Sequence, residues 1–145
     1  MTHMKKNILV VDDSALMRRV MCDIINSDSK FQATDYCRDG LEAYEKLKHT
    51  SYDGVVLDVN MPRMDGLQLL EKLQKEGIRA NVVMVSTLTD SREADVTILA
   101  MERGAIDFVA KPTNIIEAKG EAFKRQLLGV LNAVLATQKA AESVR

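Results

Sequence analysis

Polar side chains that could do chemistry together follow four short apolar runs of this 145-residue chain. In chain order they are Asp12 with Asp13, Asp58, Ser86 with Thr87, and Lys111. Three carboxylates held roughly 4 Å apart repel by about 4 kcal/mol per pair at an effective dielectric constant near 20, so such a site requires positive charge. Mg²⁺ or Mn²⁺ can supply it, and a lysine can neutralise an incoming phosphoryl group. These residue types predict a carboxylate nucleophile, Asp58, that forms an acyl phosphate.

Apolar runs alternate with segments of helical period along the whole chain. Strands are predicted at 8–11, 33–37, 54–57, 82–85 and 106–110, with Gly77 and Gly104 ending two of the helices and one continuous last helix from Glu117 to about Thr137. Apolar strands followed by amphipathic helices are typical of a parallel sheet that is covered on both faces. The sequence therefore predicts an α/β protein, a (βα)5 flavodoxin-like doubly wound sheet of five parallel strands with helices on both faces.

Four of these strands are followed at their carboxyl ends by the polar groups. Ligands of open parallel sheets bind outside this edge, where the loops diverge. Each group alone has an ordinary explanation, since Asp12–Ser14 is typical of a helix N-cap. Lys111 before Pro112 is likewise typical of a solvated lysine at a turn. The joint placement of all four groups indicates instead one site at one edge of the sheet.

The composition argues against several classes of function. A formal net charge of -1 without clustered lysines or arginines offers no electrostatic footprint for nucleic acid. No apolar run approaches the length of a membrane span or of a signal-peptide core. Cys22 and Cys37 lack the spacing of a zinc site, and free thiols in a reducing compartment are the simplest interpretation. We expect a cytoplasmic protein that binds neither nucleic acid nor a membrane.

The motifs at the strand ends are similar to those of the receiver domains of two-component response regulators, the CheY-like superfamily. The matching stretches are Val10–Ser14, Leu57–Pro62, Met64–Gly66, Met84–Ser86 and Lys111–Pro112, and the resemblance spans residues 7 to about 118. It implies that a histidine kinase transfers a phosphoryl group to Asp58, with Mg²⁺ or Mn²⁺ as the cofactor. It also implies that the domain catalyses its own phosphorylation and dephosphorylation.

The resemblance implies a role for each acidic residue of the site. Asp58 is the phosphorylated nucleophile and also a metal ligand. Asp13 and the backbone carbonyl of Asn60 are further metal ligands, and Asp12 reaches the metal mainly through water.

Three further positions carry over from the family. Lys111 pairs with the phosphoryl group, and Ser86 provides the hydroxyl that moves to a phosphoryl oxygen. Phe108 is the mobile aromatic residue that completes the switch. Through them, the face made by the fourth helix, the fifth strand and the fifth helix changes shape on phosphorylation. The resemblance also implies a cis peptide bond between Lys111 and Pro112.

Among receivers, four longer stretches most resemble the N-terminal receiver domain of chemotaxis protein-glutamate methylesterases, the CheB family. They are Asp13–Arg19, Met61–Leu67, Val83–Thr89 and Gly104–Pro112. In that family a methylesterase domain follows the receiver, and phosphorylation relieves the block that the receiver places on it. No Gly-x-Ser-x-Gly segment occurs here, so this chain should not itself hydrolyse methyl esters.

The expected organisation follows from this resemblance. Residues 5–118 are predicted as the receiver core, up to the start of the fifth helix. Residues 119–145 are predicted as the rest of the long C-terminal helix and the start of a linker to an output domain that this chain lacks. The expected partners are a CheA-like histidine kinase as phosphodonor, and that output domain or a docking partner on the switching face.

Other functions remain as alternatives. A stand-alone CheY-like receiver that acts by docking a partner is the main one. An aspartyl-phosphate phosphatase fits less well, because its signature needs Asp-x-Asp after the first strand, and Asp12 and Asp13 are adjacent. A nucleotide-binding module is disfavoured because no Gly-x-Gly-x-x-Gly or Gly-Lys-Ser/Thr loop occurs.

Overall fold

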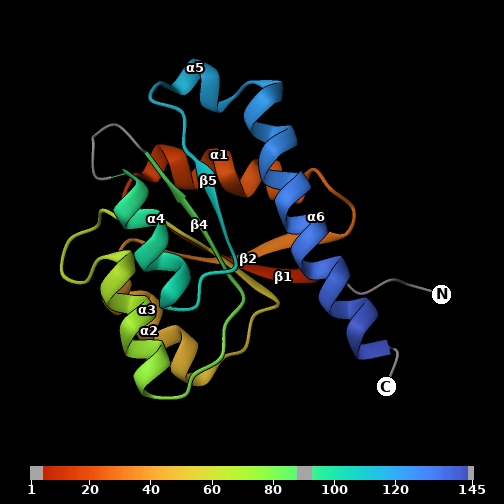
Figure 1. Cartoon of the computed structure of the whole chain (residues 1–145). Coiled ribbons are helices and arrows are strands. Elements are labelled where there is room, and N and C mark those ends of the chain that lie inside the picture. The colour runs from red at the N-terminus through yellow and green to blue at the C-terminus, as the bar shows by residue number, and fades with distance from the viewer. Residues whose placement is uncertain (1–4, 88–92, 144–145) are drawn as a thin grey trace.

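The computed structural model describes residues 5–87 and 93–143, in which five strands form one sheet surrounded by helices (Figure 1). The strands are β1 (Lys6–Val11), β2 (Phe31–Cys37), β3 (Gly54–Leu57), β4 (Val82–Ser86) and β5 (Asp107–Ala110). The helices are α1 (Ala15–Asn26), α2 (Gly40–His49), α3 (Gly66–Lys75), α4 (Glu93–Glu102), α5 (Ile115–Ala118) and α6 (Glu121–Ser143). All strands are parallel, in the order β2-β1-β3-β4-β5. The predicted five-stranded α/β fold is confirmed.

Two hydrophobic cores cover the two faces of the sheet. In β1, Ile8 and Val10 pack in the core that contains residues of α1 and α6, whereas Leu9 and Val11 pack with α2 and α3. Figure 1 shows the same division, with α1 and α6 on one side of the sheet and α2, α3 and α4 on the other. Successive side chains of a strand point to opposite faces, so a strand buried on both faces is apolar throughout.

Most element boundaries lie close to their predicted positions. β2 is longer than predicted and begins at Phe31, whose side chain is buried in the core. Gly77 and Gly104 follow α3 and α4 with positive φ angles of 68° and 104°, the left-handed conformation in which glycine commonly ends a helix. Leu88 and Thr89, the end of one stretch that carried the resemblance, lie outside the described residues.

The prediction of one continuous helix from Glu117 to about Thr137 is wrong. The region contains α5 and α6, and α5 begins earlier because the Asn114 side chain accepts a hydrogen bond of 2.9 Å from the Glu117 N–H. The chain leaves α5 at Lys119, whose N–H bonds back to carbonyl groups of that short helix. Gly120 lies at the break, and a glycine within a helix costs about 1 kcal/mol relative to alanine.

The long helix α6 packs on the sheet as an integral part of the fold. Its buried residues Phe123, Leu127, Leu131 and Leu135 recur every four positions and join the core that contains α1. Neither α6 nor another helix within residues 5–87 and 93–143 is long and apolar enough to cross a membrane.

Candidate functional site

The carboxyl ends of four adjacent strands bring the predicted polar residues together. Asp12 follows β1, Asp58 follows β3, Ser86 ends β4, and Lys111 follows β5. These strands are consecutive in the sheet, so side chains from distant parts of the sequence meet at one edge. Backbone hydrogen bonds of 2.9 Å, from the Asp58 N–H to the Val11 carbonyl and from the Lys111 N–H to the Ser86 carbonyl, hold the two residues in register with neighbouring strands.

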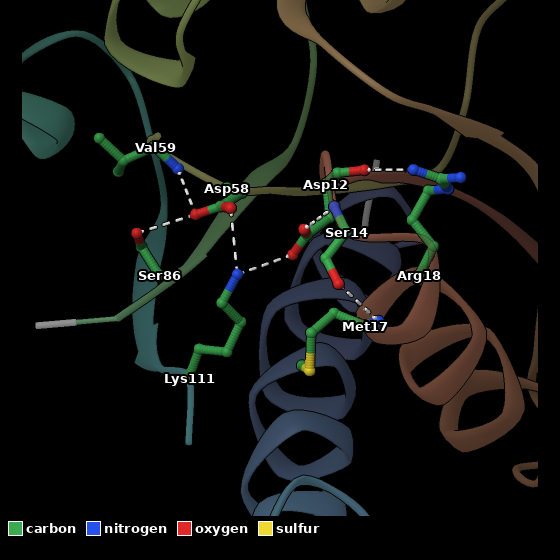
Figure 2. Close-up of polar contacts among 8 residues, drawn as sticks. All are labelled: Asp12, Ser14, Met17, Arg18, Asp58, Val59, Ser86 and Lys111. Atoms are coloured by element: carbon green, nitrogen blue, oxygen red, sulfur yellow. Dashed lines mark hydrogen bonds and ion pairs between the residues drawn. The ribbon is translucent and has the colours of Figure 1, made fainter. Parts of the chain in front are cut away.

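The ammonium group of Lys111 lies between two buried carboxylates. Its Nζ donates to Oδ2 of Asp12 at 2.9 Å and to Oδ2 of Asp58 at 3.0 Å (Figure 2). The lysine side chain is 11% exposed, and those of Asp12 and Asp58 are 0% and 4% exposed. Burial disfavours the ammonium, but the charge of Asp58 and the contact with Asp12 outweigh burial and raise the lysine pKa. Lys111 is therefore a protonated cation fixed within the site.

Both carboxylate oxygens of Asp58 have fixed partners. Oδ1 accepts a hydrogen bond from the Ser86 hydroxyl at 2.9 Å and one from the Val59 backbone N–H at 2.8 Å, while Oδ2 faces Lys111 (Figure 2). Ser86 is itself buried. A hydroxyl, an amide and an ammonium around one carboxylate fix its orientation, and the same donors could stabilise negative charge that develops on a group attached to it.

Asp12 belongs both to the site and to the start of α1. Its Oδ1 accepts from the Ser14 N–H at 2.9 Å, and the Ser14 hydroxyl oxygen caps the helix by accepting from the Met17 N–H at 3.2 Å. Burial and then the negative charge of Asp58 raise the pKa of Asp12, despite the contact with Lys111. Ionised Asp12 is thus unfavourable in its surroundings, and an added cation would stabilise it.

The acidic residues of the site form a cluster that could hold a metal ion. Asp12, Asp13 and Asp58 each place one carboxylate oxygen within 4.8 Å of the others, and Asp13 is exposed while the other two are buried. Asn60 is exposed in the loop after Asp58. Mg²⁺ prefers oxygen ligands and keeps several of its waters, so a set of oxygen donors with one open side fits this ion.

The remaining predicted positions lie near this cluster. Phe108 lies in β5, half-buried, and packs against the core of α2, α3 and α4. The peptide bond between Lys111 and Pro112 is trans, so the cis bond implied by the resemblance is absent. With the trans bond the Lys111 N–H still reaches the Ser86 carbonyl and its ammonium reaches both carboxylates. The observed contacts of the lysine therefore do not require a cis bond.

Three charged residues beside the site were not predicted from the sequence. Arg18 donates from Nη1 to the backbone carbonyl of Asp12 at 2.9 Å. Asp39 is buried at the start of α2 and contacts Nε of Arg63 at 2.8 Å. The spacing of Arg18, one helical turn after the cap Ser14, could have suggested its position. The contact between Asp39 and Arg63 depends on the shape of a loop, for which the sequence offers no comparable signal.

Known proteins with similar sequences place the chain in a family. Residues 8–120 match the response regulator receiver domain family. The chain belongs to this family. A protein-glutamate methylesterase/protein-glutamine glutaminase of Pyrococcus horikoshii is 45% identical to the receiver domain over 124 residues, which are 86% of this chain and 33% of the relative. The protein of that name in Escherichia coli (strain K12) is 50% identical over 109 residues, which are 74% of this chain and 30% of the relative.

Solved structures agree with this assignment. The response regulator domain of Thermotoga maritima CheB has a TM-score of 0.78 and 34% identity to this receiver domain, and the match covers 92% of this chain and 98% of that chain. A CheX-CheY-BeF3-Mg complex from Borrelia burgdorferi matches with a TM-score of 0.73 and 29% identity, covering 89% of this chain and 88% of that chain. The resemblance to CheB receivers is therefore confirmed, while this receiver domain spans about a third of the length of the curated methylesterase relatives that it matches.

Proposed function

We propose that this receiver domain accepts a phosphoryl group on Asp58 from a phosphohistidine of a CheA-like histidine kinase. The observation that carries the proposal is the buried Asp58 carboxylate, held between the Ser86 hydroxyl at 2.9 Å and the Lys111 ammonium at 3.0 Å beside a second buried carboxylate. Such a carboxylate is oriented and desolvated, and the groups that could receive a phosphoryl oxygen are already in place.

The transfer exchanges one bond to phosphorus for another. A carboxylate oxygen of Asp58 bonds to the phosphorus of the phosphohistidine, and the nitrogen–phosphorus bond breaks. The electron pair of that bond leaves with the imidazole, which takes up a proton from solvent. Lys111 moves its contact from the carboxylate to a phosphoryl oxygen and neutralises part of its charge. Hydrolysis of the acyl phosphate returns Asp58 and inorganic phosphate.

Mg²⁺ or Mn²⁺ fits the donor set of the site. Asp13, Asp58 and the backbone carbonyl of Asn60 would hold it, with Asp12 acting mainly through water. When bound, the ion neutralises carboxylate and phosphoryl oxygens that would otherwise repel each other. The raised pKa of Asp12, caused by burial and by Asp58, supports a need for positive charge beyond that of Lys111.

The phosphoryl group would act as a switch through Ser86 and Phe108. It adds a charge of roughly -1.5 to -2 at a buried position, and the Ser86 hydroxyl leaves Asp58 for a phosphoryl oxygen. Phe108 then moves toward the space that Ser86 vacates. The face made by α4, β5 and the α5–α6 segment changes shape as a result, and a partner reads the change.

We further propose that the partner on this face is a chemotaxis methylesterase domain. Support comes from the methylesterase relatives, of whose length the chain spans about a third. Residues 5–118 would then hold the strands and the helices up to α5, and residues 119–145 would hold α6, which packs in the same core through Leu135, and the start of the linker to the output domain. A stand-alone receiver that docks a separate protein is the alternative. The free thiols of Cys22 and Cys37 support a place in the cytoplasm.

The test is phosphorylation of the purified chain by acetyl phosphate, with and without Mg²⁺, followed by intact mass. We expect a Mg²⁺-dependent gain of one phosphoryl group in the wild type and none in Asp58→Asn. Asp23→Asn is the matched control, since Asp23 is exposed on α1 and should label like the wild type. An unlabelled wild type, or a labelled Asp58→Asn variant, would contradict the proposal.

A further inference from the structure

The loop that follows Asp58 contains a strained turn centred on Arg63. Within the described residues, Arg63 is the one non-glycine residue with positive φ, at 65°. The turn is closed by a hydrogen bond of 2.7 Å from the Met64 N–H to the Pro62 carbonyl, so it is a three-residue γ-turn of the rare form with positive φ. A residue with a Cβ pays a steric cost in this conformation, and such strain persists only where surrounding contacts impose it.

The start of α2 provides two such contacts. Nε of Arg63 pairs with Oδ2 of Asp39 at 2.8 Å, and the Gly40 N–H donates to the Met64 carbonyl at 2.8 Å. The Arg63 side chain is 55% exposed, whereas that of Asp39 is 6% exposed. Asp39 also accepts from the Glu42 N–H at 2.9 Å as the N-cap of α2, so its carboxylate is fixed independently of the loop.

The other end of the loop is fixed to Asp58 itself. The Gly66 N–H donates to the Val59 carbonyl at 2.8 Å. A Cβ on Gly66 would overlap the Asp58 carbonyl oxygen, so the start of α3 packs closely against the backbone of Asp58. Asp65 is also fixed, as the N-cap of α3 in a capping box with Gln68, so residues 60–64 connect the fixed points and Asn60 begins that stretch. The Arg63 turn lies in this same short stretch, so we expect its shape to affect where the Asn60 carbonyl lies.

We propose that Arg63 is a positioning residue, whose ion pair with Asp39 holds the strained turn and thereby places the Asn60 carbonyl for a divalent cation. The inference rests on the proposed function, because it takes the Asn60 carbonyl as a metal ligand. Neither Arg63 nor Asp39 is among the residues that would hold the cation. Their effect passes through the backbone of the loop.

Two substitutions of Arg63 separate the ion pair from the strain. Arg63→Ala removes the pair but keeps a Cβ, so the turn should open. Arg63→Gly also removes the pair, but glycine adopts positive φ at no steric cost, so the turn should persist. Asp39→Asn removes the charge but keeps an N-cap acceptor, and it should act like Arg63→Ala. The matched control is Arg19→Ala, which removes a pair between the same atom types, Nε to Oδ2 of Asp23, on exposed α1.

The first measurement needs no metal. Amide hydrogen exchange of Met64 and Gly40 reports directly on the turn and on its contact with α2. We expect exchange to accelerate by about fivefold in Arg63→Ala and Asp39→Asn, the ratio that about 1 kcal/mol of charge interaction produces. The double variant should match either single variant because the two residues act as a pair. Arg63→Gly and Arg19→Ala should exchange like the wild type at both amides.

The second measurement is the Mg²⁺ dissociation constant from calorimetric titration of the same proteins. We expect Arg63→Ala and Asp39→Asn to bind Mg²⁺ about fivefold more weakly and Arg63→Gly to bind close to the wild type. Equal binding in Arg63→Ala and wild type would overturn the inference while leaving the proposed function intact. Equal weakening in Arg63→Gly would overturn it too, since the turn would then not be the cause. A wild type that binds no Mg²⁺ would overturn both.

Discussion

Two regions of this receiver domain bury an aspartate beside a cation, with opposite results for the carboxylate. At the site, Asp12 is 0% exposed and shares the ammonium of Lys111 with Asp58. At the start of α2, the Asp39 side chain is 6% exposed, and its carboxylate pairs with Arg63 and with the N-terminus of the helix. Burial opposes the charge of both, but the pKa of Asp12 is raised whereas that of Asp39 is lowered.

The difference lies in the number of negative charges per cation. Asp58 adds to the cost of burying Asp12, whereas the Glu42 N–H and the Arg63 guanidinium outweigh the cost of burying Asp39. One region is electrostatically satisfied and serves as a fixed support. The other is deficient in positive charge, a condition that a divalent cation relieves.

Among the substitutions that test this difference, removal of Lys111 should change the free energy of unfolding most. Met has a long unbranched side chain, so Lys111→Met removes the charge while keeping much of the volume. Loss of one partner from a buried ion pair leaves uncompensated charge, and we expect the free energy of unfolding in urea to fall by about 3 kcal/mol in metal-free buffer at pH 7. Arg63→Ala should lose less, since its guanidinium is half-exposed. An equal loss in the two variants would mean that the cation contributes equally to stability in the two regions.

Neutralising the two aspartates should change stability in opposite directions. Asp12→Asn should raise the free energy of unfolding of the metal-free protein at pH 7 by about 1 kcal/mol, because it removes a charge that its surroundings disfavour. Asp39→Asn should lower it by less than about 1 kcal/mol, because Arg63 is partly screened by solvent. Urea unfolding with excess chelator measures both. A decrease in Asp12→Asn would show that its contact with Lys111 outweighs repulsion from Asp58.

The sequence predicted correctly the side chains whose positions depend on where the apolar strands end. The apolar runs fix the ends of β1, β3, β4 and β5, and parallel strands must present those ends at one edge, so the meeting of Asp12, Asp58, Ser86 and Lys111 followed. The predictions failed where the contacts of a few loop residues determine the backbone conformation. The break at Gly120 and the trans bond before Pro112 each depend on local contacts that helical or strand periodicity does not encode.

The support around Asp39 was missed for a related reason. Asp39 and Arg63 are 24 positions apart in two different loops, and nothing in the spacing of either links them. Their contact forms only when Arg63 adopts the strained turn, and with arginine at this position the turn depends on the contact. Such mutual dependence is visible only once the backbone is known.

The pH dependence of the free energy of unfolding should also distinguish Asp12 from Asp39. This effect is the smallest of those predicted, but its direction differs between the two residues. The folded pKa of Asp12 lies above its ordinary value of 3.8, so the folded state binds this proton more tightly than the unfolded state. The contribution of Asp12 is therefore full below about pH 3.8 and is lost as the pH rises through its folded pKa. The folded pKa of Asp39 lies below 3.8, so its contribution is present above that pH and is lost as the pH falls through the lowered pKa.

Each aspartate can be followed as the difference in unfolding free energy between wild type and its asparagine variant, measured in urea between pH 3 and pH 7 with chelator. On acidification the Asp12→Asn difference should begin to shrink at a pH above 3.8 and be gone near pH 3.8, whereas the Asp39→Asn difference should begin to shrink only near pH 3.8 and persist to lower pH. Saturating Mg²⁺ should shrink the Asp12→Asn advantage at pH 7, because the cation supplies the missing charge. It should enlarge the deficit of Asp39→Asn by about 1 kcal/mol, because that variant binds the cation about fivefold more weakly. The reverse order of titration would mean that Lys111 alone satisfies Asp12, and the site would then not be deficient in positive charge.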